Sequence, residues 1–174
     1  MIKNRYILSI DQGTTSSRAI IFDLNGEILA QKNFEFKQYF PKNGWVEHDP
    51  KEILETTTNA INHVIAESRI KATEICTAGI TNQRETVVAW DKSNGQPVYN
   101  AIVWQDRRTD EICKDLRNKN LTEDIQNKTG LIIDPYFSAT KIKWIIENVD
   151  EAKKIISSNN LLVGTIDSWL LWNL

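Results

Sequence analysis

The stretch Ile10-Asp-Gln-Gly-Thr-Thr-Ser-Ser-Arg18 is the most informative part of the chain for both fold and function. Apolar runs flank it, Tyr6 to Ile10 before and Ala19 to Phe22 after, so it is predicted to be a polar turn between two antiparallel strands. It is not a P-loop, because the GxxxxGK[ST] pattern and its following helix are absent. On spacing alone an ordinary β-turn accounts for it, since glycine, threonine and serine are common in turns.

The side chains of this turn also suit a magnesium-bound phosphate group. Asp11 stands at the end of the first strand, where a carboxylate can hold the water shell of the ion. Gly13 lets the backbone approach a ligand closely, and Arg18 offsets negative charge. The hydroxyl groups available to phosphate oxygens are those of Thr14, Thr15 and Ser16.

Beyond this turn, the sequence predicts a three-stranded meander. Asn25-Gly26 is a pair that favours a type I′ hairpin, in which both central residues have positive φ. The third strand is then expected over Glu27 to Phe36.

A helix is predicted next, followed by a strand that returns to the sheet. Asp49 is expected to cap the helix, Pro50 to be its first residue and Glu52 to complete a capping box. The returning strand is expected over Glu74 to Ile80. The helix should lie on the sheet through an apolar face made of Ile53, Leu54, Ala60, Ile61, Val64 and Ile65.

The second half is predicted to be a hairpin followed mainly by helices. The hairpin joins Thr86–Trp90 to Pro97–Val103 around Asn94-Gly95. A short strand over Leu161–Val163 and a helix from Ser168 close the chain. The helices between them are expected over Arg107 to Leu116 behind an Asp106 cap, over Thr122 to Thr129, and around Ile142, Ile145, Ile146 and Val149.

This order of elements indicates a mixed α/β domain. It matches the opening of the ribonuclease-H-like, actin-like ATPase fold, a mixed sheet with an antiparallel meander and flanking helices. Order alone also fits other α/β folds.

Composition restricts the class of protein. The 174 residues carry a formal net charge of −2, with 41% hydrophobic residues, which fits one ordinary domain and argues against a nucleic-acid partner. No apolar run is long enough for a membrane span, and Met1 to Tyr6 do not resemble a signal peptide, so a cytoplasmic location is expected. Cys76 and Cys113 are expected to be reduced thiols.

Arg84-Glu85 is the second chemical feature. Neighbouring residues of a regular strand point to opposite faces, so the backbone must leave strand geometry after about Thr81 if both side chains serve one ligand. A guanidinium donor beside a carboxylate acceptor suits the adjacent hydroxyl groups of a small polyol. Without further context the pair also reads as an exposed, ion-rich turn.

Five stretches together resemble the glycerol kinases, a group within the carbohydrate kinase family of the actin, Hsp70 and sugar-kinase superfamily. They occur in the family's order and span nearly the whole chain. They are Ile10 to Arg18, Gly44-Trp-Val-Glu-His-Asp-Pro50, Gly79-Ile-Thr-Asn-Gln-Arg-Glu-Thr86, Tyr99-Asn-Ala-Ile-Val-Trp-Gln105 with Arg107-Arg108, and Thr129-Gly-Leu-Ile-Ile-Asp-Pro-Tyr-Phe-Ser138.

This resemblance implies transfer of the γ-phosphoryl group of ATP to glycerol, with Mg²⁺ as the metal. Arg84, Glu85 and Tyr136 are then expected to bind glycerol, and Trp104 is a candidate for the wall against its carbons. Gly13, Thr14, Thr15, Ser16 and Arg18 are expected to contact the phosphates, and Asp11 to position the metal.

The resemblance also implies that part of the machinery lies elsewhere. The family's catalytic aspartate is expected beyond Leu174, so residues 1–174 are predicted to be an incomplete first domain of a two-domain kinase, inactive alone. The full-length enzyme is expected to be a homo-oligomer. The alternatives are a pentulose or gluconate kinase of the same family, and a non-catalytic polyol-binding or assembly module.

The remaining aromatic and basic residues receive structural predictions. His48 and His63 are expected in solvated or capping roles, and Arg107 and Arg108 in exposed or interface roles. The tryptophans assigned to packing are Trp45, Trp90, Trp144, Trp169 and Trp172.

Overall fold

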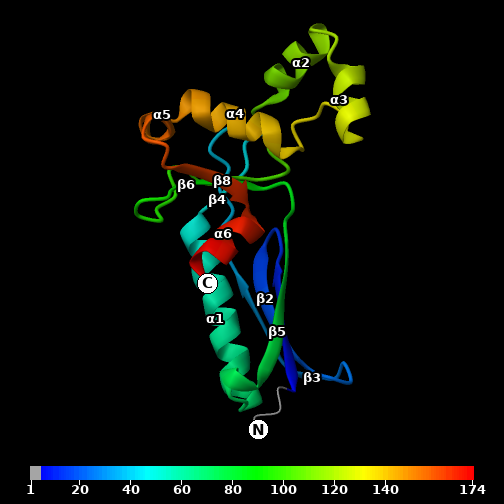
Figure 1. Ribbon diagram of the computed structural model, residues 1–174, viewed down its shortest axis with the longest axis vertical. Helices are drawn as coiled ribbons and strands as arrows, with labels where there is room; N and C mark the ends of the chain where they lie inside the picture. Colours follow the sequence, from blue (N-terminus) through cyan, green and yellow to red (C-terminus); the bar gives the residue numbers. More distant parts are fainter. Residues whose placement is uncertain (1–4) are drawn as a thin grey trace.

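The computed structural model describes residues 5–174 as two four-stranded sheets with helices packed around them. Figure 1 shows an elongated molecule in which the first sheet occupies one end and helices α2 and α3 the other.

The first sheet has the strand order β3-β2-β1-β5. Its strands are β1 (Tyr6–Gln12), β2 (Ser16–Asp23), β3 (Ile28–Glu35) and β5 (Ile75–Asn82). The first three are antiparallel, and β5 pairs in parallel with β1. The predicted meander and returning strand are therefore confirmed.

Helix α1 (Pro50–Ser68) covers one face of this sheet, as its apolar periodicity predicted. Asp49 caps it by accepting a hydrogen bond from the Lys51 N–H at 2.8 Å. The capping box is wrong, because Glu52 instead accepts the Lys37 N–H at 3.0 Å. The core between helix and sheet is formed by Leu8, Ile10, Ala19, Ile21, Ala30, Ala60 and Val64.

The type I′ turn at Asn25-Gly26 is also wrong, because only Gly26 has positive φ, at 87°. The loop is longer than two residues, with the Asp23 N–H donating to the Glu27 carbonyl at 2.9 Å. The Asp23 carboxylate stabilises this longer loop by accepting the backbone N–H groups of Asn25 and Glu27. Gly95 likewise has a positive φ, 69°, in the turn that follows β6.

The second sheet was not predicted as a separate unit. Its order is β4-β7-β6-β8, and every neighbouring pair is antiparallel. The strands are β4 (Glu47–His48), β6 (Val87–Asp91), β7 (Ala101–Ile102) and β8 (Leu161–Thr165). Strand β4 has only two residues, which is too short for a periodic pattern in the sequence. The predicted hairpin pairs β6 with β7, but its second strand is reduced from Pro97–Val103 to Ala101–Ile102.

Helices cover both faces of strand β6. On one face, Val88 and Trp90 pack with α6 (Ile166–Asn173). On the other, Val87 and Ala89 pack with α4 (Ser138–Asn148) and α5 (Asp150–Ser157). This double coverage explains why β6 reads as an unbroken apolar run.

Helices α2 (Asp110–Asn118) and α3 (Thr122–Thr129) complete the structure. Helix α2 begins three residues later than predicted, with Thr109 rather than Asp106 at its N-cap position. Helix α5 was not predicted. In residues 5–174, no helix combines the length and apolar character that a membrane span requires.

Candidate functional site

The two chemical motifs meet because strands β1 and β5 are parallel neighbours. Gln12 pairs with Asn82 at the carboxyl ends of these strands. The chain then continues into the Gly13–Ser16 turn after β1 and into the Gln83–Thr86 turn after β5. Adjacent strand ends therefore place the hydroxyl-rich turn beside Arg84.

The hydroxyl-rich turn is a tight hairpin closed by a hydrogen bond from the Gly13 N–H to the Ser16 carbonyl at 2.9 Å. A Cβ atom added at Gly13 would meet only the Ser16 carbonyl oxygen, at 3.4 Å. Space beside the backbone is therefore open to a ligand. Thr15 is exposed, and Thr14 and Ser16 are half-buried.

Asp11 is half-buried at the end of β1, and no hydrogen bond joins its carboxylate to any other residue of the described chain. That carboxylate is free to hold a cation. Within residues 5–174 no group of three or more metal-ligating side chains forms, so such an ion would need water or phosphate for its other ligands.

Arg18 pairs with Asp11 across the two strands, but its exposed side chain lines a separate open recess of about 480 Å³. Lys32 from β3 lines the same recess. Arg18 is the one predicted phosphate ligand that the structure places outside the hairpin turn.

A small pocket brings together three of the four predicted polyol ligands. Its volume is about 270 Å³, and its lining residues are Asn82, Gln83, Arg84, Trp104 and Tyr136. The rings of Trp104 and Tyr136 meet edge to face, with centroids 5.8 Å apart. Glu85, the fourth, accepts a hydrogen bond from the Ser138 hydroxyl at 2.8 Å, two residues beyond Tyr136. Strand β5 ends at Asn82, so the backbone does leave strand geometry before Arg84.

Trp104 joins this pocket directly to the hydroxyl-rich turn. Its indole N–H donates to the Thr14 hydroxyl oxygen at 3.1 Å. Because the Thr14 oxygen acts as acceptor in this bond, its own proton remains available for a ligand.

Behind the two motifs lies a buried polar network that sequence reasoning missed. His48 is fully buried, so its predicted solvated or capping role is wrong. The imidazole contacts Gln38 at 2.6 Å and Gln83 at 3.3 Å. Burial lowers the pKa of His48 to about 4, and the ring is neutral at pH 7.

Arg108 was predicted to be exposed or at an interface, and this too is wrong, because its side chain is 0% exposed. The guanidinium pairs with Glu47 at 2.7 Å and Asp106 at 2.8 Å. It stacks on Trp45 and Trp144, with its central carbon 3.8 Å and 4.7 Å from the ring centroids. The cluster joins Glu47 of β4 to Trp144 of α4. Arg107 is exposed as predicted.

Lys141 is a second buried charge close to the site. Its ammonium group donates to the backbone carbonyls of Tyr136 and Phe137, and so holds the segment that carries Tyr136. Burial lowers the pKa of Lys141 to about 8, although the carboxylate of Glu85 acts in the opposite direction. Lys141 lies four residues before the buried Ile145, on the same face of α4. This spacing was the signal in the sequence that could have indicated burial of Lys141.

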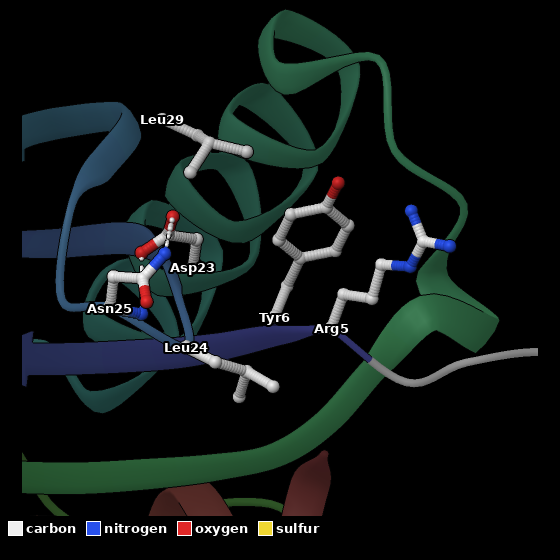
Figure 2. A pocket seen from close by; sticks show the side chains of 6 residues that line it. All are labelled: Arg5, Tyr6, Asp23, Leu24, Asn25 and Leu29. Atoms are coloured by element: carbon white, nitrogen blue, oxygen red, sulfur yellow. Dashed lines mark hydrogen bonds between the residues drawn. The ribbon is translucent and has the colours of Figure 1, made fainter.

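A further recess of about 430 Å³ lies at the opposite end of the first sheet. Figure 2 shows Arg5 and Tyr6 on one side of it, with Asp23 and Asn25 on the other. The Asp23 carboxylate is already used by the loop backbone, and the hydrogen bond from Glu27 contributes most to lowering its pKa. We assign no ligand to this recess.

Comparison with known proteins identifies the family. Residues 6–174 match the model of the FGGY family of carbohydrate kinases, N-terminal domain. The chain is 58% identical over 170 residues to a glycerol kinase of Petrotoga mobilis, covering 98% of this chain and 34% of the relative. It therefore spans about a third of the length of the relatives that it matches.

Solved structures agree with this match. The crystal structure of Plasmodium falciparum glycerol kinase with ADP superimposes with a TM-score of 0.89 at 41% identity, over 97% of this chain and 34% of that one. A gluconate kinase from Lactobacillus acidophilus superimposes with a TM-score of 0.85 at 22% identity, over 97% of this chain and 33% of that one, which supports the fold alone. The predicted actin-like sugar-kinase fold is confirmed, and the chain belongs to the FGGY family of carbohydrate kinases.

Proposed function

We propose that this chain forms the phosphate-binding and acceptor-binding side of an ATP-dependent glycerol kinase. The observation that carries the proposal is the single pocket lined by Arg84, Trp104 and Tyr136, tied to the hydroxyl-rich turn through Thr14. The similarity to relatives named glycerol kinase supports glycerol as the acceptor.

The proposed acceptor site uses charged and aromatic groups for different parts of glycerol. Arg84 donates to hydroxyl oxygens, and Glu85 accepts hydroxyl protons. Tyr136 adds a phenolic hydroxyl, and Trp104 provides a flat apolar wall for the carbon chain. A volume of about 270 Å³ suits an acceptor of this small size.

The proposed donor site holds the phosphates of ATP at the turn. Backbone N–H groups after Gly13 and the hydroxyls of Thr14, Thr15 and Ser16 donate to phosphate oxygens, since the Gly13 N–H already closes the turn. Arg18, whose side chain lines a separate recess, offsets phosphate charge from a greater distance. Asp11 is proposed to hold Mg²⁺ through its water shell; when bound, the ion neutralises charge on the phosphates.

The carboxylate that accepts the glycerol proton is proposed to come from outside residues 1–174. Glu85 is a poor substitute, because the Ser138 hydroxyl already occupies one of its oxygens. We therefore propose that these residues belong to the first domain of a two-domain, cytoplasmic and homo-oligomeric enzyme. A coupled assay should detect no glycerol-dependent ADP formation by this chain alone.

Glycerol binding by the chain itself tests the acceptor site. Calorimetry and thermal unfolding with increasing glycerol should show a bound ligand and a rising Tm, because a ligand that binds only the folded state stabilises it. Arg84→Ala should abolish the effect, whereas Arg107→Ala, which removes an exposed arginine outside the pocket, should keep it.

Two other results would contradict the proposal. A larger stabilisation by a pentulose or gluconate than by glycerol would assign the site to another acceptor of the same family. No stabilisation by any of these compounds would favour an assembly role without a preformed pocket.

A further inference from the structure

We propose that a buried chain of hydrogen bonds through His48 positions the backbone of Thr14, so that His48 and Gln38 are positioning residues for the donor phosphates. This inference rests on the proposed function and extends it to residues that contact neither substrate. The chain begins at the hydroxyl-rich turn and ends at the acceptor pocket.

The first half of the chain runs from Thr14 to His48. The Gln38 side-chain amide donates to the Thr14 carbonyl at 2.9 Å. This bond directs the Gln38 amide oxygen to the other side, where it lies 2.6 Å from His48 Nε2. Since an amide oxygen only accepts, His48 Nε2 must carry the proton.

The second half runs from His48 to Trp104. The Gln83 amide nitrogen lies 3.3 Å from His48 Nδ1, which must accept because Nε2 carries the only proton of the neutral ring. The Gln83 amide oxygen accepts the Thr86 hydroxyl proton at 2.8 Å, and the Thr86 oxygen accepts the Trp104 backbone N–H at 3.2 Å. Each donor in this series therefore has an acceptor, and every hydrogen bond is donated in the same direction, from Trp104 toward Thr14.

A second branch anchors the same network to the turn. The Gln83 amide nitrogen also approaches the Gly13 carbonyl at 3.2 Å and the Gln12 side-chain oxygen at 3.0 Å. The Gln12 amide donates to the same Gly13 carbonyl at 2.8 Å. The carbonyls of Gly13 and Thr14 are thus both held by side chains, which fixes the direction of the N–H groups that follow them.

Water cannot replace these contacts at low cost, because the side chains at the centre of the hydrogen-bond chain are buried. His48 and Thr86 are 0% exposed and Gln83 is 6% exposed. Breaking one link leaves a buried donor or acceptor without a partner, which destabilises the arrangement more than losing a solvated bond would.

The test compares single and double breaks of the chain in the intact enzyme that contains these residues. His48→Phe keeps a ring against Phe36, whose centroid lies 5.0 Å from that of His48, but removes both hydrogen bonds. Gln38→Met keeps the side-chain volume and removes both polar contacts. The matched controls are His63→Phe and Gln126→Met, at exposed positions on α1 and α3.

Each chain variant should raise the KM for ATP and the Kd for MgADP about tenfold while the KM for glycerol changes less than twofold, as expected for one unsatisfied buried group. The double variant should be no worse than the poorer single variant, because the links act in series. In the folded wild type, imidazole nitrogen NMR shifts should report an Nε2-protonated, neutral His48.

Three results would overturn the inference: an unchanged KM for ATP in Gln38→Met, an equal rise in both KM values, or additive effects in the double variant. Gln38 is only half-buried, so its variant should fold even if His48→Phe does not. Absence of glycerol turnover in the wild type would instead contradict the proposed function. The Kd for MgADP would still test whether the hydrogen-bond chain through His48 positions the turn.

Discussion

Single buried polar residues carry much of the organisation of this site. His48 and Lys141 both lie in the interior, and each holds backbone or amide groups next to a predicted ligand-binding residue. Burial disfavours the charged form of each side chain, which makes their protonation states measurable through stability.

The stability of the chain should depend on pH through His48. Burial lowers its pKa from 6.5 to about 4, so between these values the unfolded chain binds a proton that the folded chain does not. The free energy of unfolding should therefore fall as the pH decreases from 6.5 to 4, by about 3 kcal/mol from this residue. Urea denaturation from pH 4 to pH 7 measures it.

Variants separate this contribution from those of other groups. His48→Phe should lose less stability across this range than the wild type, whereas His63→Phe should follow the wild type. Parallel pH profiles for the wild type and His48→Phe would show that the imidazole does not carry the effect.

Lys141→Met should destabilise the fold and weaken glycerol binding. The substitution removes the donor to the Tyr136 and Phe137 carbonyls, so we expect a loss of about 1–3 kcal/mol in the free energy of unfolding. Calorimetry should show weaker binding of glycerol, because the segment that carries Tyr136 is released. Lys143→Met, at an exposed position on the same helix, is the control; equal effects of the two variants would contradict this role.

At the scale of secondary-structure elements, strand β8 and helix α6 are tightly packed against each other. Strand β8 leads directly into α6, and Gly164 lies at their junction. A Cβ atom at Gly164 would lie 2.7 Å from the Ser168 Cβ, which is closer than such atoms can approach.

Gly164→Ala should therefore destabilise the chain by about 1–3 kcal/mol through forced displacement of α6. Ser168→Gly in the same chain should restore much of the loss, because it removes the atom that clashes. Gly79→Ala, where a Cβ atom meets nothing within 4 Å, is the control. Thermal unfolding compares the variants, and a neutral Gly164→Ala would show that the junction adapts.

Elements with a continuous pattern were predictable from the sequence, whereas the two-residue strands were missed or predicted too long. The periodicity of α1 and the apolar runs of β1 and β2 are continuous enough to identify them. Strands β4 and β7 form only because tertiary neighbours supply their hydrogen bonds. The turn at Gly26 was misjudged because the Asp23 side chain selects a longer loop than the pair Asn25-Gly26 alone favours.

The candidate site also contains residues that were predictable from the sequence and residues that were not. The identity of Arg84, Glu85 and Tyr136 came from family resemblance, and the end of β5 was inferred from the need to bring Arg84 and Glu85 to one side. The roles of His48 and Arg108 were wrong, because their burial depends on partners distant in the sequence, such as Gln83 and Glu47.

At the scale of the whole molecule, helix α1 connects the two sheets. Ile53 packs in the core beneath the second sheet, while Ala60 and Val64 pack against the first. One rigid helix shared by two cores should make them unfold together.

Tryptophan fluorescence can test this cooperativity, because all six tryptophans lie at position 45 or later. Val64→Ala, in the core of the first sheet, should lower the free energy of unfolding by about 2 kcal/mol. If the cores are coupled, fluorescence and circular dichroism should show the same reduced urea midpoint. A fluorescence midpoint that stays at the wild-type value would instead indicate independent cores.

The hydrogen bond between Trp104 and Thr14 also has a consequence for the geometry of the proposed reaction. Phosphoryl transfer needs the acceptor oxygen about 3–3.5 Å from phosphorus and in line with the leaving group. One indole ring lines the proposed acceptor pocket and donates through its nitrogen to Thr14 in the hydroxyl-rich turn, where the donor phosphates are proposed to bind. If both proposed sites are occupied, the width of the indole sets the distance between the two substrates. Trp104→Phe would then keep an aromatic wall but lose the fixed distance, so misaligned encounters would increase.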